Sequence, residues 1–396
     1  MRHARRPLHR MIHLARILLR EIRLPLLEPF RTSTGVVAER RVLLLELTDA
    51  SGAVAWSECV AEAVPSYSPD TVDTCWLAVT EWLAPRVLGR SFHSGEQVVQ
   101  ALRRGVRGHR MAIAAVEMGC WAMEATLLGQ PLAVLLGRSS RVAGEAGRRP
   151  RARVATGISL GIQENPTALA ERSGAELRAG YRRIKVKIGP GHDVAFVRAA
   201  REALGADVAL MADANSAYRL DEPSHVEALR ALDAFALTLI EQPLAHDDLV
   251  RHAALQRLIA TPICLDESIT SDARAEDMIT LGAGRVINLK PGRVGGLAES
   301  VAIHDRCARA GVPLWCGGML ETGIGRAYNV ALASLPGFTE PGDLSPSSRY
   351  WARDIVRPAW TMEEGSLRVP LDRAGIGVEV DVDVIDALTV RAAALQ

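Results

Sequence analysis

The chain has 396 residues, of which 48% are hydrophobic and 23% are charged, and its formal net charge is +1. This composition is typical of a soluble globular protein whose length allows a large core and two domains. The balanced charge excludes a dedicated nucleic-acid surface, and no apolar stretch is long enough to cross a membrane. We therefore expect neither nucleic acid nor a membrane as a partner.

Cysteine usage and the basic N-terminus bear on the compartment and on where the fold begins. Six scattered cysteines without a CxxC pair predict buried free thiols in a reducing cytoplasm, not disulfides or a zinc site. Residues 1–19 are basic and lack the small-residue cleavage site of an export signal. We expect a disordered arm there, ahead of the first strand.

The first domain is predicted to be α+β and to cover residues 20–150. Its start alternates apolar and polar residues in the manner of a β-hairpin, with the turn at residues 49–52. Helical periodicity follows over residues 70–137, and the almost wholly apolar run at 109–137 predicts a buried helix. The Gly- and Arg-rich segment 137–154 is typical of a linker.

From residue 151 to 350, short apolar strands alternate with helices, which predicts parallel βα units. Polar residues recur every 24 to 28 residues at the strand ends, namely Lys187, Asp213, Glu241, Asp266, Lys290 and Cys316. A closed barrel brings the carboxyl ends of its strands into one ring, whereas an open sheet would leave the outer members of the series far apart. We therefore predict a barrel, with its last strand near residues 342–345 and a tail, 351–396, that returns to the first domain.

Lysine is rare in this chain, and its positions are informative. There are 44 arginines and three lysines. An ammonium group can lose its proton and act as a base, whereas a guanidinium stays charged. Chance survival on a solvated edge would explain one lysine, but Lys185, Lys187 and Lys290 all adjoin the recurring acids. We expect neighbouring positive charge to lower the pKa of Lys187, and Arg293 to lower that of Lys290.

Three acids at successive strand ends predict a metal site. Oxygen ligands from rigid elements suit Mg²⁺, and the same ligands would accept Mn²⁺ or another divalent cation in its place. Alone, Asp213 would be an Asx turn, Glu241 a loop charge and Asp266 a helix N-cap, but their recurrence once per unit favours a joint site. A metal beside a lysine base predicts abstraction of the proton α to the carboxylate of a small-molecule substrate. An amine on each face would allow racemisation.

Five motifs, in order, carry a family resemblance: "KVK", "DAN", "EQP", "LDES" and "LKPGRVGG". Together they resemble the muconate-lactonizing subgroup of the enolase superfamily. Residues 316–343, followed by "SSRYW", resemble the o-succinylbenzoate synthase and N-acylamino acid (N-succinylamino acid) racemase family. The resemblance runs from about residue 20 to the C-terminus. It implies an α/β fold, a TIM-type (β/α)7β barrel over 151–350 with an α+β capping domain, whose loops 29–35 and 57–68 close over the substrate.

The resemblance also implies roles for individual residues. Lys187 and Lys290 would be the acid/base pair, and Lys185 their electrostatic partner. The Mg²⁺ ligands would be Asp213, Glu241 and Asp266. The substrate site would be lined by Ser159, Asn215, Arg293, Gly318, Met319 and Leu320. Tyr328 departs from the pattern, since many relatives have histidine there.

The activity implied is that of an o-succinylbenzoate synthase of menaquinone biosynthesis, an N-succinyl/N-acylamino acid racemase, or both, because each reaction begins with the same proton abstraction. Dipeptide epimerase and muconate cycloisomerase remain alternatives within the superfamily. A metal-binding barrel without catalysis is the non-enzyme alternative, although no ligand or base has been lost. We expect a cytoplasmic homo-oligomer.

Overall fold

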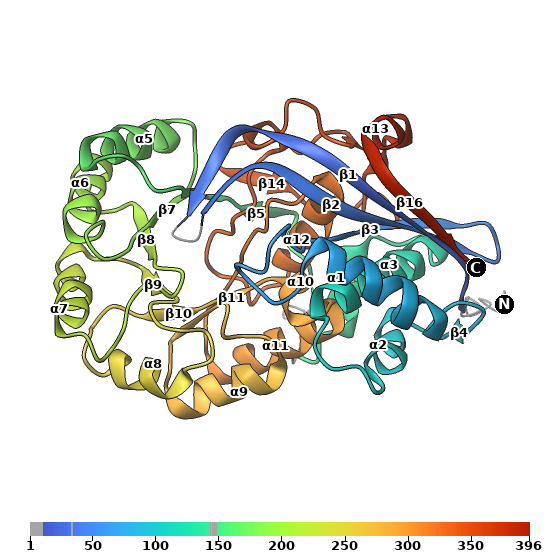
Figure 1. Ribbon diagram of the computed structural model, residues 1–396, viewed down its shortest axis with the longest axis horizontal. Helices are drawn as coiled ribbons and strands as arrows, with labels where there is room; N and C mark the ends of the chain where they lie inside the picture. The colour runs from blue at the N-terminus through green and yellow to red at the C-terminus, as the bar shows by residue number, and fades with distance from the viewer. Residues whose placement is uncertain (1–10, 33–34, 143, 145–148) are drawn as a thin grey trace, which may run out of the picture.

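The computed structural model describes residues 11–32, 35–142, 144 and 149–396. Two large sheets form the framework of the fold (Figure 1). One is antiparallel and belongs to the N-terminal half, and the other is parallel and curls into a barrel. Parts of the predicted arm, capping loop and linker lie outside the described residues, namely 1–10, 33–34, 143 and 145–148. Within the described residues, all six cysteines are free and buried, as predicted, and no helix is both long and apolar enough to cross a membrane.

Seven parallel strands form the barrel wall, and each is hydrogen-bonded to the next in chain order. They are β6 Gly157–Leu160, β7 Arg183–Lys187, β8 Ala209–Asp213, β9 Leu239–Glu241, β10 Ile263–Leu265, β11 Val286–Leu289 and β12 Leu314–Cys316. The helices between and after them are α5 Pro166–Arg178, α6 Val194–Leu204, α7 Pro223–Ala231, α8 Leu249–Gln256, α9 Asp272–Leu281, α10 Pro291–Val294, α11 Leu297–Ala310 and α12 Gly323–Ala333. The barrel predicted from the repeat spacing is confirmed.

An irregular segment around Gly342 closes the ring where the eighth strand was expected. The Gly342 carbonyl accepts a hydrogen bond from Gly157 of β6 at 2.7 Å, and the Asp343 N–H donates to the Cys316 carbonyl of β12 at 2.9 Å. The segment therefore bridges the two edges of the sheet. Because closure leaves no open edge, the strand ends form one ring, as the barrel prediction requires.

Strand alternation explains why the acids face the barrel interior. One hydrophobic cluster is made of a single side chain from each of five strands, namely Met211, Leu239, Cys264, Val286 and Trp315. Successive side chains of a strand point to opposite faces, so a residue two positions further on shares the face of the first. Asp213, Glu241 and Asp266 each stand two residues after a member of this cluster. They therefore lie on top of its apolar floor.

The capping sheet has the antiparallel order β16-β1-β2-β3. Its strands are β1 Ile12–Thr32, β2 Gly35–Asp49, β3 Val54–Cys59 and β16 Thr389–Leu395, while the short β4 Ser91–Phe92 pairs with β1. The helices of this half are α1 Val72–Leu77, α2 Gly95–Arg103, α3 Arg110–Leu127 and α4 Leu132–Ser139. Helix α3 is buried along nearly its whole length and packs between this sheet and the barrel (Figure 1).

The prediction of a disordered arm through residue 19 is wrong for residues 12–19, which belong to β1. Ile12, Leu14, Ile17 and Leu19 are fully buried, so the apolar side chains between the arginines supply a core-facing strand surface. The basic charge of the segment hid this pattern.

The C-terminal tail returns to the capping sheet, because β16 pairs with β1 from Ile17 opposite Leu395 (Figure 1). The strand-like segment 366–381 does not make this contact. It holds β14 Ser366–Arg368, which pairs with β5 Arg153–Ala155, and β15 Glu379–Val380, which pairs with β13 Val356–Arg357. Helix α13 Val382–Leu388 then leads into β16.

A core substitution tests the start of β1. Leu19→Ala removes a fully buried side chain, and we expect the free energy of unfolding to fall by about 2–5 kcal/mol. Met11→Ala, at a position that is 41% exposed, is the control and should change it by no more than about 0.5 kcal/mol. Urea denaturation measures both, and equal, negligible changes would favour a disordered arm.

Candidate active site

Strand register brings the predicted residues together at one end of the barrel. Lys187 lies opposite Asp213 between β7 and β8, and Asp213 lies opposite Glu241 between β8 and β9. Asp266 directly follows β10, and Lys290 directly follows β11. Since β8, β9 and β10 separate β7 from β11, Lys187 and Lys290 flank the arc of three acids.

Lys185 is the centre of the ion-pair network. Its Nζ lies 2.8 Å from Glu241 Oε2, 3.2 Å from Asp213 Oδ2 and 3.1 Å from Asp343 Oδ2, above the ring of Trp315. Burial alone would lower the pKa of Lys185, but the three carboxylates, Asp343 foremost, raise it well above its ordinary value. Lys185 therefore stays charged and offsets the repulsion among the acids.

Lys187 is held by a smaller set of partners. Its Nζ donates to Asp213 Oδ2 and to Asn215 Oδ1, both at 2.6 Å. Asn215 adopts the left-handed conformation, with φ 42°, and its side-chain amide donates to Glu267 Oε1 at 3.1 Å. The amide thus links the lysine of β7 to an acid that follows β10.

Lys290 and Arg293 share one carboxylate on the other side of the arc. Lys290 Nζ donates to Asp266 Oδ2 at 2.8 Å, and Arg293 Nη1 donates to Asp266 Oδ1. Tyr67 reaches in from the capping domain, where its hydroxyl donates to Asp266 Oδ1 at 2.9 Å and its ring lies 4.5 Å from Lys290 Nζ. The capping loop therefore contributes directly to this cluster.

The prediction that Arg293 lowers the pKa of Lys290 below its ordinary value is wrong for the protein without bound metal. Burial and the nearby Arg293 do act to lower this pKa, but Asp266 and Tyr67 outweigh them, so that it is raised. The reason is direct pairing, because each predicted metal ligand contacts a cationic side chain. Burial likewise acts to raise the pKa of Asp266, yet Lys290 and Arg293 hold it below its usual range.

A pocket of about 530 Å³ opens above these residues, between the barrel and residues 35–41 and 62–67 of the capping domain. Its wall includes most of the predicted residues, namely Ser159, Lys185, Lys187, Asp213, Asn215, Asp266, Lys290, Gly318, Met319 and Leu320. Glu241 is fully buried beneath them. Arg293 lies behind Asp266, outside this wall, and also donates to the backbone carbonyls of Ile269 and Asn288. It therefore contacts the acid cluster rather than the pocket space.

Three residues of the site were missed in the sequence. Asp343 pairs with Lys185 and Arg183 and accepts from Ser159 Oγ at 2.9 Å. It stands 27 residues after Cys316, so one more step of the repeat would have found it. Glu267 adjoins a predicted ligand in the same "LDES" motif. Tyr67 belongs to the loop 57–68 that was expected to close over the substrate, but no local signal marks its contact with Asp266, 199 residues away.

The donor set fits a hard divalent cation. Burial and the charges of Asp213 and Asp266 raise the pKa of Glu241 to about 8, so the acids repel one another. Glu267 Oε2 is buried and has no hydrogen-bond partner among the described residues. Among the described residues, no group of three or more Asp, Glu, His or Cys side chains is already arranged so that it could hold a metal ion. The oxygen donors present are of the type that Mg²⁺ prefers, and binding requires them to turn from the lysines.

Comparison with known families agrees with this geometry. Residues 16–137 match the mandelate racemase / muconate lactonizing enzyme N-terminal domain, and residues 168–384 match the enolase C-terminal domain-like family. The chain therefore belongs to the enolase superfamily, in the mandelate racemase / muconate lactonizing enzyme family. This confirms the superfamily resemblance and the capped barrel.

Individual relatives agree over nearly the full length. The chain is 44% identical to the o-succinylbenzoate synthase of Geobacillus stearothermophilus, over 96% of each chain. It is 45% identical to the N-succinylamino acid racemase of Thermus thermophilus, over 94% of this chain and 96% of that one. The crystal structure of an enolase-superfamily member from Listeria innocua superposes with a TM-score of 0.90 at 36% identity, covering 97% of this chain and 99% of the other.

Replacing Lys185 with methionine tests whether it neutralises the buried acids. In metal-free protein, Lys185→Met deprives Asp213, Glu241 and Asp343 of a shared cation, and we expect the free energy of unfolding to fall by about 3–5 kcal/mol. Lys187→Met is the matched control, with a smaller expected loss because Asp213 keeps Lys185. Urea denaturation followed by tryptophan fluorescence measures both, and equal losses would contradict the central role of Lys185.

Proposed function

We propose that the protein is a Mg²⁺-dependent enzyme that removes the proton α to a carboxylate, as an o-succinylbenzoate synthase, an N-succinyl/N-acylamino acid racemase, or both. The observation that carries this proposal is the position of Lys187 and Lys290 on opposite sides of the acid arc, on β7 and after β11. A substrate between them has one amine on each face. The names of the two relatives at nearly equal identity support both activities.

The lysines divide the chemistry by face. In the deprotonated form, Lys187 takes the α-proton from one side of the substrate, and Lys290 returns a proton to the other side in racemisation. Lys185 remains charged, because its three carboxylate partners favour the ammonium form. Dehydration needs the same first step but no proton donor on the second face. One site can therefore serve both reactions.

Asp213, Glu241 and Asp266 would hold the metal. A bound Mg²⁺ would supply positive charge that stabilises the anion formed when the α-proton leaves. Asn215 and Glu267 hold the neighbouring lysine through their hydrogen-bonded link, and Tyr67 with Arg293 holds Asp266. The capping segments at 35–41 and 62–67 limit access of water to the pocket.

The charge of the site favours a carboxylate substrate. Its core acids are matched by an equal number of side chains that can carry a positive charge, namely Asp213, Glu241, Asp266, Glu267 and Asp343 against Arg183, Lys185, Lys187, Lys290 and Arg293. With Lys187 deprotonated, as its role as the base requires, a divalent cation would leave one positive charge in excess. The carboxylate of the substrate would balance it. Dipeptide epimerase and muconate cycloisomerase remain the alternatives, and a metal-binding barrel without catalysis is the non-enzyme one.

The position of Arg293 beside Lys290 favours racemase competence in addition to synthase activity. Its guanidinium holds Asp266, the same acid that holds Lys290. As a synthase the protein would act in menaquinone biosynthesis, in the cytoplasm, and as a homo-oligomer.

Metal binding is testable without activity. After removal of divalent ions with a chelator, Mg²⁺ at about a hundredfold excess over its Kd should stabilise the wild-type protein by about 2.7 kcal/mol. We expect Asp213→Asn and Glu241→Gln to lose this gain, because each removes an anionic ligand. Asp372→Asn, at an exposed acid that pairs with Arg368, should keep it. Thermal denaturation measures the gain, and full Mg²⁺ stabilisation of Glu241→Gln would contradict its role as a ligand.

Lysine variants test the proton transfers. Lys187→Ala should slow both dehydration and racemisation by about a hundredfold to ten-thousandfold, the usual contribution of a general base. Lys290→Ala should cripple racemisation more than dehydration, since only racemisation needs the second face. Formation of o-succinylbenzoate and exchange of the α-hydrogen of N-succinylamino acids in deuterated water are the measurements.

Lys187→Arg is the matched control for charge, because arginine keeps the cation but cannot act as the base. It should be as impaired as Lys187→Ala. Persistence of both exchange and dehydration in Lys187→Ala would refute the proposed mechanism, and negligible effects of Lys290→Ala on both reactions would refute the role given to Lys290.

A further inference from the structure

Two barrel helices begin directly after segments of the site. Helix α11 begins at Leu297, after the turn that carries Lys290, and α12 begins at Gly323, after the turn formed by residues 318–320. The first N–H groups of a helix need acceptors from outside the helix. At α11 the N-cap position is Gly296, which has no side chain to supply one. The acceptor has to come from elsewhere in the fold.

Glu117 of α3 supplies it from the capping domain. Its carboxylate accepts from the Leu297 N–H at 2.8 Å and from the Ala298 N–H at 2.9 Å, and also from Trp121 Nε1 at 2.7 Å. Glu117 is fully buried. A Cβ at Gly296, which has φ 117°, would collide with this carboxylate. The glycine therefore makes room for a cap that comes from another domain.

Glu58 of β3 does the same for α12. It accepts from the Thr322 hydroxyl at 2.6 Å and from the Gly325 N–H at 2.9 Å, and it too is buried. Tyr328 of the same helix donates its hydroxyl hydrogen bond to the Trp56 carbonyl of β3 at 2.6 Å. The capping domain thus holds the starts of these two helices, α11 and α12.

Both carboxylates are buried at an electrostatic cost. Burial, together with the charge of Glu321 in the case of Glu58, raises the pKa of each of these two glutamates to about 7, although their hydrogen bonds oppose the rise. Among the described residues, Glu117 accepts hydrogen bonds from backbone and indole N–H groups, not from cationic side chains. The partial positive charge of a helix N-terminus favours an anion there. A buried acid at a helix start therefore gains a favourable electrostatic interaction that the same acid would lack elsewhere in the core.

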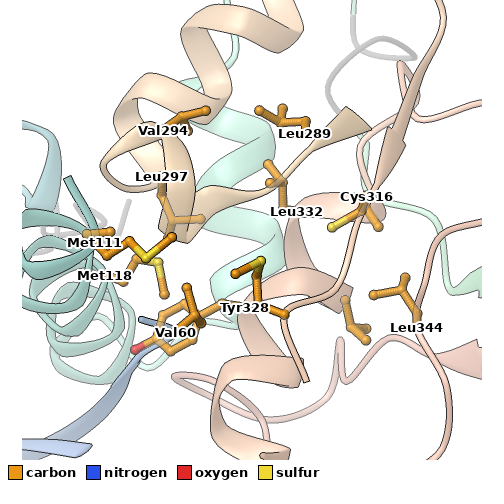
Figure 2. Packing of buried hydrophobic residues seen from close by; sticks show 14 of the residues in the cluster. Val60, Met111, Met118, Leu289, Val294, Leu297, Cys316, Tyr328, Leu332 and Leu344 are labelled. Atoms are coloured by element: carbon orange, nitrogen blue, oxygen red, sulfur yellow. The ribbon is translucent and has the colours of Figure 1, made fainter. Parts of the chain in front are cut away.

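The start of α11 is connected to Lys290 through a short, hydrogen-bonded turn. The Val294 N–H donates to the Lys290 carbonyl at 3.2 Å, and the Gly296 N–H donates to the Pro291 carbonyl at 2.9 Å. Met111 of α3 lies in the buried core with Val294 and Leu297 (Figure 2). The turn therefore has little freedom to move independently of α3.

We propose that Glu117 is a positioning residue for Lys290: through this carboxylate, α3 of the capping domain fixes the start of α11 and the turn that carries the lysine. This inference rests on the proposed roles of Lys187 and Lys290. Lys187 lies on β7, on the other side of the acid arc, and has no such connection to α3 among the described contacts. Loss of the Glu117 acceptor should therefore impair one face of the site and not the other.

The test measures each face separately. The two enantiomers of one N-succinylamino acid are incubated with full-length, Mg²⁺-loaded protein in deuterated water, and Lys187→Ala and Lys290→Ala assign each enantiomer's α-hydrogen exchange to one lysine. In Glu117→Gln an amide group faces one of the helix N–H donors. We expect the Lys290-dependent exchange to fall by about tenfold to a hundredfold more than the Lys187-dependent exchange, as for a displaced catalytic group. Glu117→Asp, which withdraws the charge by one methylene, should shift the ratio in the same direction.

Two matched variants separate positioning from general destabilisation. Glu124→Gln alters another buried acid of α3, which accepts from the Gly95 N–H at the start of α2. Any loss of exchange in this variant should be the same for the two enantiomers. Glu58→Gln removes one charged acceptor at the start of α12, where Thr322 and Asp354 also accept from helix N–H groups, and it should raise KM for both enantiomers without preference for a face. Equal losses on both faces in Glu117→Gln, or an unchanged Lys290-dependent rate in a folded Glu117→Gln protein, would overturn the proposal.

Amide hydrogen exchange followed by mass spectrometry supplies a readout that needs no substrate. Peptides that cover residues 290–298 should exchange faster in Glu117→Gln than in wild type, and at the wild-type rate in Glu124→Gln. If wild-type protein does not exchange the α-hydrogen of any substrate offered, the proposed function fails, while these peptides still decide whether Glu117 holds the turn. Unchanged protection of the peptides in Glu117→Gln would overturn the positioning role.

Discussion

The site depends on the neutralisation of acids that the barrel brings together in its buried interior. A buried carboxylate is stable only with hydrogen bonds or a cation, and three of them meet at Lys185 Nζ. Strand alternation places two of them, Asp213 and Glu241, above the apolar cluster that includes Met211 and Leu239. These three carboxylates explain why Lys185 keeps its proton. The same charge balance prepares the acids for a divalent cation.

Much of the barrel and of its polar ring could be predicted, because one physical rule generates both. Parallel βα units of near-constant length put one residue per unit at the same end, so spacing alone identified Asp213, Glu241 and Asp266. Asp343 continues this spacing, 27 residues after Cys316, but it was missed because no regular strand precedes it. Backbone hydrogen bonds of residues 342–343 nevertheless close the barrel and hold this acid beside Lys185.

Other features could not be predicted, because they depend on contacts between distant segments. Tyr67 meets Asp266 only when the capping domain is in place. The raised pKa of Lys290 results from the pairing of side chains that the sequence analysis assigned to a metal. In β1, Ile12 and Leu14 carried the apolar signal, but the surrounding arginines made the segment resemble a solvated arm. In each case the contact that determines the structure is made with a segment that lies far away in the sequence.

The capping domain is therefore more than a cover for the pocket. Its loop residue Tyr67 contacts an acid of the site, and its buried Glu58 and Glu117 bind the helix starts that follow two segments of the site. Helix α3 also packs against the capping sheet, whose β2 contributes residues 35–41 to the pocket wall. One helix thus connects part of the pocket wall with the turn that carries Lys290. Under the proposed roles of the two lysines, a change in the pocket wall that tilted α3 would alter proton transfer at the Lys290 face and not at the Lys187 face.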